Sequence, residues 1–268
     1  MTPHLVISDL DADASFRAAV RAHGENPDDP WIGGYAPHMW ERVRPIWEAT
    51  MGTAFHGRAL EFGCNYGATA IVLGALGVRV TAIDVDSALV RLARLNAARY
   101  GVSGRIDFVG GYDGVRLPFA SSAFEAVVCA GVLDYVDWSA LPQVQREIDR
   151  VLKPGGTLIV CGTSNRLWPR EMHSRRWFAN YRPRWVDRLA GREVQRGVWP
   201  WKIRYGFGRY QNLDWLDRGA AYTAARLRMP GGEGRRAVSL AAKCLRPLRL
   251  TPGLLTPSLS IALRKESS

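Results

Sequence analysis

The chain has 268 residues, of which 47% are hydrophobic, and it carries a formal net charge of +11. This length and apolar content are sufficient for a globular core, and they exclude a disordered or fibrous chain. The four cysteines include no Cys-x-x-Cys pair. Neither a zinc site nor a disulfide framework is therefore indicated, and we expect no metal.

The charge is unevenly distributed along the chain. Residues 1–165 hold 14 Lys and Arg against 18 Asp and Glu, whereas residues 166–268 hold 22 against 7. The second part also contains six of the ten tryptophans. The start of the chain lacks a basic region followed by an apolar run, and the apolar stretch 68–78 is too short to span a bilayer. With few cysteines, these features predict a cytoplasmic protein.

Residues 1–54 are predicted to form an N-terminal helical cap. After it, an apolar strand runs into the turn Glu61–Gly67, then a helix, then a second strand that ends at Asp84. This order is that of a nucleoside-binding βαβ unit, in which glycine permits close backbone approach and an acid binds ribose hydroxyls. Asn65 stands where a dinucleotide cradle has its middle glycine. Because Glu61 would attract a cation, a positively charged nucleoside fits better than a pyrophosphate.

Strands and helices continue to alternate along the next hundred residues. A helix is predicted over residues 87–100, with Asp86 or Ser87 as its N-cap, and a second over residues 141–152, which Lys153–Gly156 terminates. Strands are expected over three apolar stretches, namely residues 106–109, 126–130 and 157–161. The alternation predicts a mostly parallel sheet with helices on both faces.

This series resembles the class I S-adenosylmethionine-dependent methyltransferases, in the small-molecule branch that includes the quinone-biosynthesis enzymes. The resemblance covers residues 57–165, and its motifs are Leu60–Gly67, Ile83-Asp84, Asp113–Phe119, Phe124–Val128 and Arg150–Gly156. It implies an α/β fold, Rossmann-like and doubly wound, with a mostly parallel seven-stranded sheet whose last strand is antiparallel.

The resemblance also implies how S-adenosylmethionine would be held. Glu61 would face the amino group of the methionine part, Asp84 would bind the ribose hydroxyls, and Asp113 would accept from the adenine amino group. Gly114 would donate its amide to an adenine nitrogen. The remaining expected cofactor contacts lie on the glycine turn and at the ends of the second and fourth strands: Gly63, Cys64, Asn65, Gly67, Val85, Cys129 and Ala130.

Residues 166–250 are predicted to form a basic, tryptophan-rich lid inserted before residues 251–268, which supply the last strand and a tail. Four interpretations of the lid remain open. It binds an anionic or amphiphilic small molecule, it contacts an anionic membrane surface, it binds nucleic acid, or it is a solvated basic surface. Nucleic acid is disfavoured, because no Asn-Pro-Pro-aromatic motif follows the fourth strand.

The predicted reaction is methyl transfer to a small or lipid-like acceptor, at oxygen. A hydroxyl acceptor would profit from a general base, for which His173, Asp134 and Tyr135 are the candidates. Expected substrate contacts are Tyr35, His38, Trp40 and Trp168, although Trp40 would alternatively pack in the core. The other hypotheses are a cofactor-binding regulatory or scaffold protein without turnover, and a nucleic-acid methyltransferase.

Overall fold

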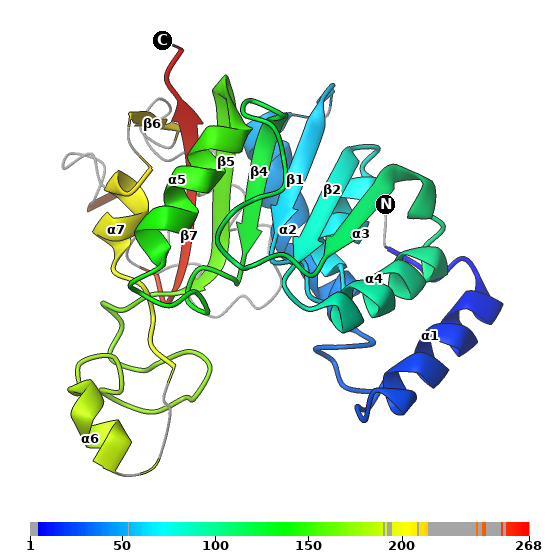
Figure 1. The fold of residues 1–268 in the computed structure, drawn as a ribbon, viewed down its shortest axis with the longest axis horizontal. Coiled ribbons are helices and arrows are strands. Elements are labelled where there is room, and N and C mark those ends of the chain that lie inside the picture. Colours follow the sequence, from blue (N-terminus) through cyan, green and yellow to red (C-terminus); the bar gives the residue numbers. More distant parts are fainter. Residues whose placement is uncertain are drawn as a thin grey trace.

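A computed structural model describes residues 5–52, 54–189, 191, 195–207, 209–213, 240, 243–244, 253 and 256–267. Within these residues the chain forms one seven-stranded sheet with the order β3-β2-β1-β4-β5-β7-β6 (Figure 1). Its strands are β1 (Arg58–Phe62), β2 (Arg79–Asp84), β3 (Ile106–Gly110), β4 (Phe124–Ala130), β5 (Leu152–Ser164), β6 (Tyr210–Asn212) and β7 (Ser258–Lys265).

The first five strands are parallel, and the last two are antiparallel to their neighbours. The strand order reverses between β1 and β4, where one half of the sheet winds away from the other. Such a switch point opens a crevice at the carboxyl ends of the strands. The predicted Rossmann-like fold with an antiparallel last strand is confirmed.

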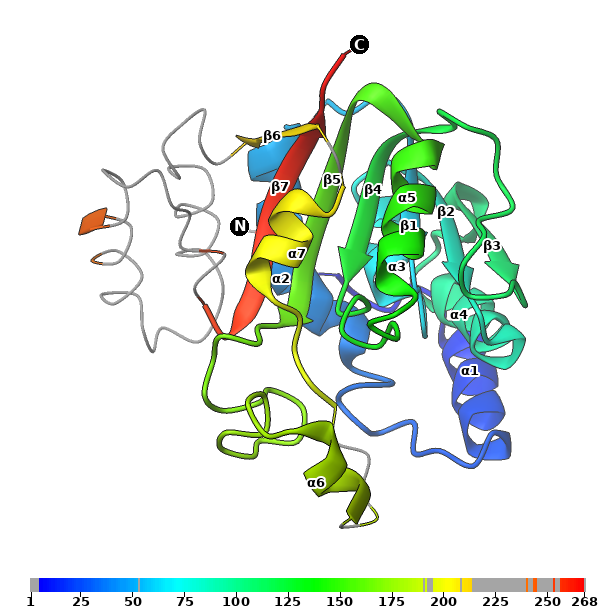
Figure 2. The same cartoon turned by 60° about the vertical axis from the view of Figure 1, so that its left-hand side comes forward.

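Two apolar layers cover the sheet, because side chains alternate between its faces along each strand. Ala59 packs on one face with helices α2, α3 and α4, whereas Leu60 and Phe62 pack on the other with α5 and α7. Figure 2 shows α5 and α7 side by side on their common face. The helices are α1 (Leu10–Ala22), α2 (Tyr35–Met51), α3 (Ala68–Ala75), α4 (Ser87–Arg99), α5 (Leu141–Val151), α6 (Arg184–Leu189) and α7 (Pro200–Tyr205), with a 3-10 turn η1 (Ser103–Arg105).

The helix starts follow local signals. The carboxylate of Asp86 accepts hydrogen bonds from the amides of Ala88 and Leu89, as the expected N-cap of α4 should. Helix α1 packs outside α4 through Phe16 and Val20, and α2 packs on α3.

Two elements differ from the sequence prediction. Strand β5 begins at Leu152 rather than at Thr157, because Leu152 already pairs with Phe124 on β4, and the intervening residues bulge before Thr157 pairs with Ala126. Strand β6 comes from the range assigned to the lid, since Tyr210–Asn212 pairs with β7. Most of the predicted lid after residue 213 lies outside the described residues.

The segment that follows β5 and carries α6 projects beyond the end of the sheet at which β4 terminates (Figure 1). Among the described residues, no helix combines the length and the hydropathy needed to cross a bilayer.

Candidate functional site

A cavity of about 930 Å³ opens at the carboxyl ends of β1, β2, β4 and β5. Its size lies near the upper end of the range of small-molecule sites. The walls come from the glycine turn after β1, the ends of β2 and β3, the start of α2, the loop after β4 and the segment after β5. The cavity therefore occupies the switch point of the sheet.

The glycine turn forms the part of the wall nearest β1. Gly63 has a φ of +76°, and a Cβ atom there would lie 2.2 Å from a methyl carbon of Val132. The amides of Gly63 and Cys64 both donate to the carbonyl of Ile83, each at 2.9 Å. These hydrogen bonds hold the turn against β2, and only glycine fits at position 63.

Asp84 lies at the end of β2 with a fixed carboxylate. One oxygen accepts from the amide of Asn65 at 2.8 Å, and the other accepts from the amide of Asp86 at 3.1 Å. Asn65 takes the left-handed conformation that its side chain tolerates, with a φ of 47°. Each carboxylate oxygen keeps a further lone pair that can accept from a ligand hydroxyl.

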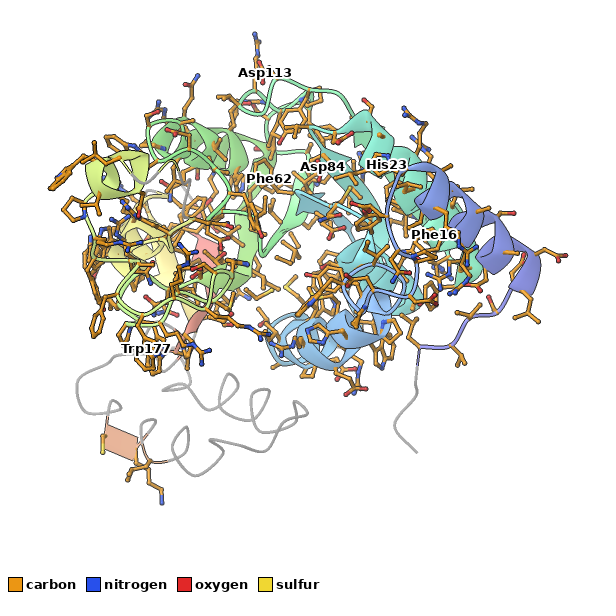
Figure 3. All side chains as sticks on the ribbon, turned by 90° about the horizontal axis from the view of Figure 1, so that it is seen from below. Phe16, His23, Phe62, Asp84, Asp113 and Trp177 are labelled. Atoms are coloured by element: carbon orange, nitrogen blue, oxygen red, sulfur yellow. The ribbon has the colours of Figure 1, made fainter. Side chains whose placement is uncertain are left out.

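Asp113 lies on the loop after β3, on the same cavity wall as Val85 and Gly114. Its Oδ1 accepts from the amides of Val115 and Arg116, and these bonds hold the pKa of the Asp113 carboxyl below its usual value. In Figure 3, which looks onto the strand ends, Asp84 lies near Phe62, and Asp113 lies farther out, on a loop at the margin of the molecule. Asp113 therefore caps its own turn beside the cavity.

Glu61 does not line the cavity, contrary to expectation. The alternation along β1 points this side chain to the face that carries Ala59 and α3, where it is 2% exposed. Its Oε2 accepts from the Ala70 amide at 2.9 Å, and burial raises the pKa of its carboxyl to about 8. The Glu61 carboxylate, which the resemblance assigned to the cofactor, therefore binds the backbone of α3.

Four other expected cofactor contacts also lie outside the cavity wall. Cys129 is fully buried between the sheet and α5, and the cavity wall begins with the next turn, at Gly131 and Val132. The others behind the wall are Cys64, Gly67 and Ala130. Gly67 instead allows close helix packing, since a Cβ atom there would lie 3.1 Å from Ala93 and from the ring of Phe108.

Helix α2 contributes one aromatic wall. The rings of Tyr35 and His38 are stacked at 6.0 Å, and Trp31 meets both rings edge-on. Burial raises the pKa of Tyr35 to about 12 and, with the charge of Arg42, lowers the pKa of His38. The expected contact between Trp40 and the substrate is wrong. Trp40 is 5% exposed and packs in the core, because its side chain leaves α2 on another face than that of Tyr35 and His38.

The three candidates for a base meet in one hydrogen-bonded group. Nε2 of His173 lies 2.8 Å from Oδ2 of Asp134, and Nδ1 lies 3.4 Å from the hydroxyl of Tyr135. The hydrogen bond to Asp134 raises the pKa of His173, against the opposing effect of burial. His173 and Tyr135 line the cavity, whereas the Asp134 side chain lies behind them, fully buried.

Glu171 fixes the loop that carries His173. It is fully buried, and its carboxylate accepts from the amides of His173 and Ser174 and from the hydroxyl of Ser164. The expected substrate contact of Trp168 is also wrong. It is 40% exposed and does not line the cavity, because its backbone is held in a turn by Asn165 and Asn180.

Several cavity residues were not predicted. Arg42 follows His38 by four positions on α2, so helical periodicity gives a signal that could have identified it. Arg175 lies in an irregular loop, and no sequence pattern would have placed it there. The other unpredicted residues include Phe62, Leu89, Tyr112, Val132, Met172, Ser258 and Ser260. In the described part of the chain, no group of three His, Cys, Asp or Glu side chains could hold a metal ion.

Residues 60–160 match the family model described as "Methyltransferase domain". This segment is similar to methyltransferase domains. Over 111 residues it is 37% identical to the ubiquinone biosynthesis O-methyltransferase of Xanthomonas axonopodis pv. citri, covering 41% of this chain and 44% of that protein. Over 101 residues it is 31% identical to the sterol 4-C-methyltransferase strm-1 of Caenorhabditis elegans, covering 38% and 29%. The matched segment thus spans less than half of each relative.

Solved structures extend the likeness of fold over most of the chain. A SAM-dependent methyltransferase from Methanosarcina mazei aligns with a TM-score of 0.51 at 17% identity, covering 80% of this chain and 95% of that one. The [4+2]-cyclase SpnF aligns with the same TM-score at 20% identity, covering 84% and 81%. Because this fold also carries a protein named as a cyclase, the reaction must be argued from the site.

S-adenosylmethionine is the cofactor that the methyltransferase domain implies, and the cavity residues fit it. Gly63 lines the cavity without a side chain of its own, and Asp84 presents a carboxylate whose orientation is fixed by two amides. Both features suit an adenosine ribose placed against the turn.

Proposed function

We propose that this protein is a methyltransferase that transfers a methyl group from S-adenosylmethionine to a hydroxyl oxygen of a small or lipid-like molecule. One observation carries the proposal. A single cavity joins the nucleoside wall, with Gly63 and Asp84, to His173, whose imidazole is bonded to the buried Asp134. A wall suited to a nucleoside and a histidine suited to act as a base therefore line one cavity, and this supports transfer to a hydroxyl, which profits from a general base.

The chain's residues would hold the cofactor along the ends of β1, β2 and β3. Asp84 would accept both ribose hydroxyls, and the wall of Val85, Asp113 and Gly114 would receive the adenine. When bound, S-adenosylmethionine supplies an electrophilic methyl group on a sulfonium. Alignment against the opposite wall then supplies much of the rate acceleration.

His173 would remove the proton of the acceptor hydroxyl. Asp134 accepts from Nε2, which leaves Nδ1 without a proton and directed toward Tyr135 at the cavity wall. As the acceptor oxygen takes the methyl group, its hydroxyl proton would pass to Nδ1 of His173. The buried Asp134 stabilises the imidazolium that results.

Isothermal titration with S-adenosylmethionine tests the cofactor half. Asp84→Ala should weaken binding at least tenfold, since two charge-assisted hydrogen bonds are lost. The exposed Asp107→Ala, on the neighbouring strand, is the control and should bind as the wild type does. Normal affinity in Asp84→Ala, with an unchanged melting temperature, would contradict the ribose assignment.

Formation of S-adenosylhomocysteine in the presence of hydroxylated aromatic acceptors tests the transfer half. Product should form with the wild type and should fall at least a hundredfold in His173→Ala, as for loss of a general base. Tight cofactor binding without product from any acceptor would favour a regulatory or scaffold protein instead.

Peripheral membrane contact and a cytoplasmic location are further parts of the proposal. After β5, four aromatic side chains lie close together in sequence and are 47% to 64% exposed: Trp177, Phe178, Tyr181 and Trp185. Arg176 immediately precedes them, and Arg182, which also pairs with Asp187, lies between Tyr181 and Trp185; this mixture of rings and cations suits an anionic lipid surface. Sedimentation with phosphatidylglycerol vesicles should be lost in Trp177→Ser/Phe178→Ser and kept in Leu10→Ser, which alters an exposed leucine on α1. Equal sedimentation of both variants would contradict the contact.

A further inference from the structure

The cavity extends along one face of α2. The side chains with which α2 lines it are spaced as i, i+3, i+4, i+7, i+8 and i+11 of a helix: Tyr35, His38, Met39, Arg42, Val43 and Ile46. This spacing places them on a single stripe of the helix. From Tyr35 to Ile46 the helix rises by about 16 Å, or roughly three turns. The cavity is therefore long as well as large.

The buried part of this stripe is apolar. Met39, Val43 and Ile46 are only 6%, 2% and 7% exposed, and they belong to the apolar cluster on this face of the sheet. Arg42, on the same stripe, is exposed. Because the three apolar side chains follow one another by about one turn each, they form a narrow apolar strip along the helix.

The apolar strip faces β5 and β7. Cys161 of β5 lines the cavity, and burial raises its pKa to about 12, so its neutral thiol acts as a small apolar group. Leu259 and Ile261 pack on the face of α5 and α7, so the alternation along β7 points Ser260 to the opposite face. Figure 2 shows α2 on that opposite side of β5 and β7. We call this part of the cavity the apolar arm, and its lining is Met39, Val43, Ile46, Cys161, Ser258 and Ser260.

The apolar arm begins beside the proposed base. Burial raises the pKa of Tyr35, and the nearby Cys161 and Tyr135 raise it further. Tyr35 therefore lies between the arm and Tyr135, whose hydroxyl is 3.4 Å from Nδ1 of His173. A molecule whose hydroxyl reaches His173 can thus extend past Tyr35 into the apolar arm.

The cofactor wall lies toward the other end of the sheet. Asp84 ends β2 and Asp113 follows β3, whereas the apolar arm lies over β5 and β7. A cofactor held by Asp84 leaves the arm open to a second ligand. An apolar group that enters such a space leaves water and gains packing contacts. A compact ring would contact one turn of α2, whereas an extended chain would contact the whole apolar strip.

We propose that the methyl acceptor carries a flexible aliphatic chain, and that the apolar arm binds this chain while the reacting hydroxyl lies at His173. This inference rests on the proposed function. It narrows the class of the acceptor to amphiphiles with an extended apolar chain. It also names Ile46, the last residue of the apolar strip, as a residue that determines the chain length that the cavity accepts.

Two phenols that differ only in chain length, 4-butylphenol and 4-octylphenol, test the inference. Isothermal titrations are made with and without saturating S-adenosylhomocysteine. Each methylene group that becomes buried tightens binding by roughly fourfold, so the wild type should prefer the octyl compound by roughly tenfold or more. Ile46→Trp should fill the end of the arm, remove most of this preference and leave the affinity for 4-butylphenol within about twofold.

Ala49→Trp is the matched control, because it adds the same ring at an exposed position of α2. It should keep the preference of the wild type within about twofold. Ser260→Leu narrows the apolar arm from β7 and makes the same test should Ile46→Trp fail to fold. Equal affinities of the wild type for the two phenols, or equal preferences in Ile46→Trp and Ala49→Trp, would overturn the inference.

His173→Ala shows whether the bound chain belongs to the acceptor. It should weaken binding of 4-octylphenol by roughly fivefold, because the phenol hydroxyl loses a hydrogen-bond partner. An unchanged affinity would assign the apolar arm to a separate lipid, and the inference would be overturned. A chain-length preference in a protein that does not bind S-adenosylhomocysteine would instead contradict the proposed function, so the two failures are distinguished.

Discussion

Asp134 orients the imidazole of His173 and raises its pKa. Its carboxylate has one oxygen bonded to the imidazole at 2.8 Å and to the amide of Ser164 at 3.1 Å. This arrangement orients the ring, and it favours the protonated form of His173, so that its pKa is raised from the ordinary value of 6.5.

A pH profile of kcat/KM should report this residue. His173 acts as a base only when neutral, so activity should rise as the pH passes upward through a pKa above 6.5. In Asp134→Asn the midpoint should move to lower pH, and the plateau should fall by roughly a hundredfold because the ring loses its orientation. Asp107→Asn, on the exposed side of β3, should change neither. An unchanged midpoint in Asp134→Asn would exclude His173 as the titrating base.

Arg99 connects three parts of the chain, namely α4, α1 and the loop before α2. Its guanidinium, at the end of α4, donates to Asp13 on α1 at 2.7 Å and to the carbonyl of Gly33 at 3.3 Å. It also lies 4.4 Å from the centre of the Phe16 ring. Since Gly33 lies between Trp31 and Tyr35, two rings of the aromatic wall, α1 and this wall contact the same buried arginine.

Arg99→Met should therefore destabilise the protein by roughly 3 kcal/mol, because a buried ion pair loses one partner. Urea denaturation measures the change. Arg91→Met is the control, since Arg91 lies on the same helix but is exposed, and it should stay within about 0.5 kcal/mol of the wild type. Similar losses of unfolding free energy in the two variants would show that the helix propensity of α4, and not the buried contacts of Arg99, is responsible.

At the scale of the whole molecule, one buried acid should change how stability depends on pH. The pKa of Glu61 rises from 4.5 to about 8 on folding, chiefly because burial disfavours its charge. The folded state therefore keeps a proton that the unfolded state releases. The stabilising contribution is complete below pH 4.5 and is lost as the pH rises toward 8.

Relative to Glu61→Gln, the wild type should lose roughly 1 kcal/mol of unfolding free energy per pH unit between pH 5 and 8. Urea denaturation at several pH values measures this difference. Glu266→Gln, at the exposed end of the chain, should run parallel to the wild type. Parallel curves for Glu61→Gln would contradict a proton held in the folded state.

The sequence by itself determined most strands of the sheet and the two acids, Asp84 and Asp113, on one wall of the cavity. Strand alternation, the Asp86 cap and the glycine turn act between near neighbours, so the pattern of residues decides them. The positions of Asp84 and Asp113 at strand ends follow from the same local order. The parallel sheet then brings those ends to one edge.

Only the tertiary structure decided which side chains share the cavity. Asp134 and His173 are separated by β5, and their hydrogen bond depends on how two loops fold over adjacent strands. Contacts of this kind join residues distant in sequence, and no local periodicity encodes them.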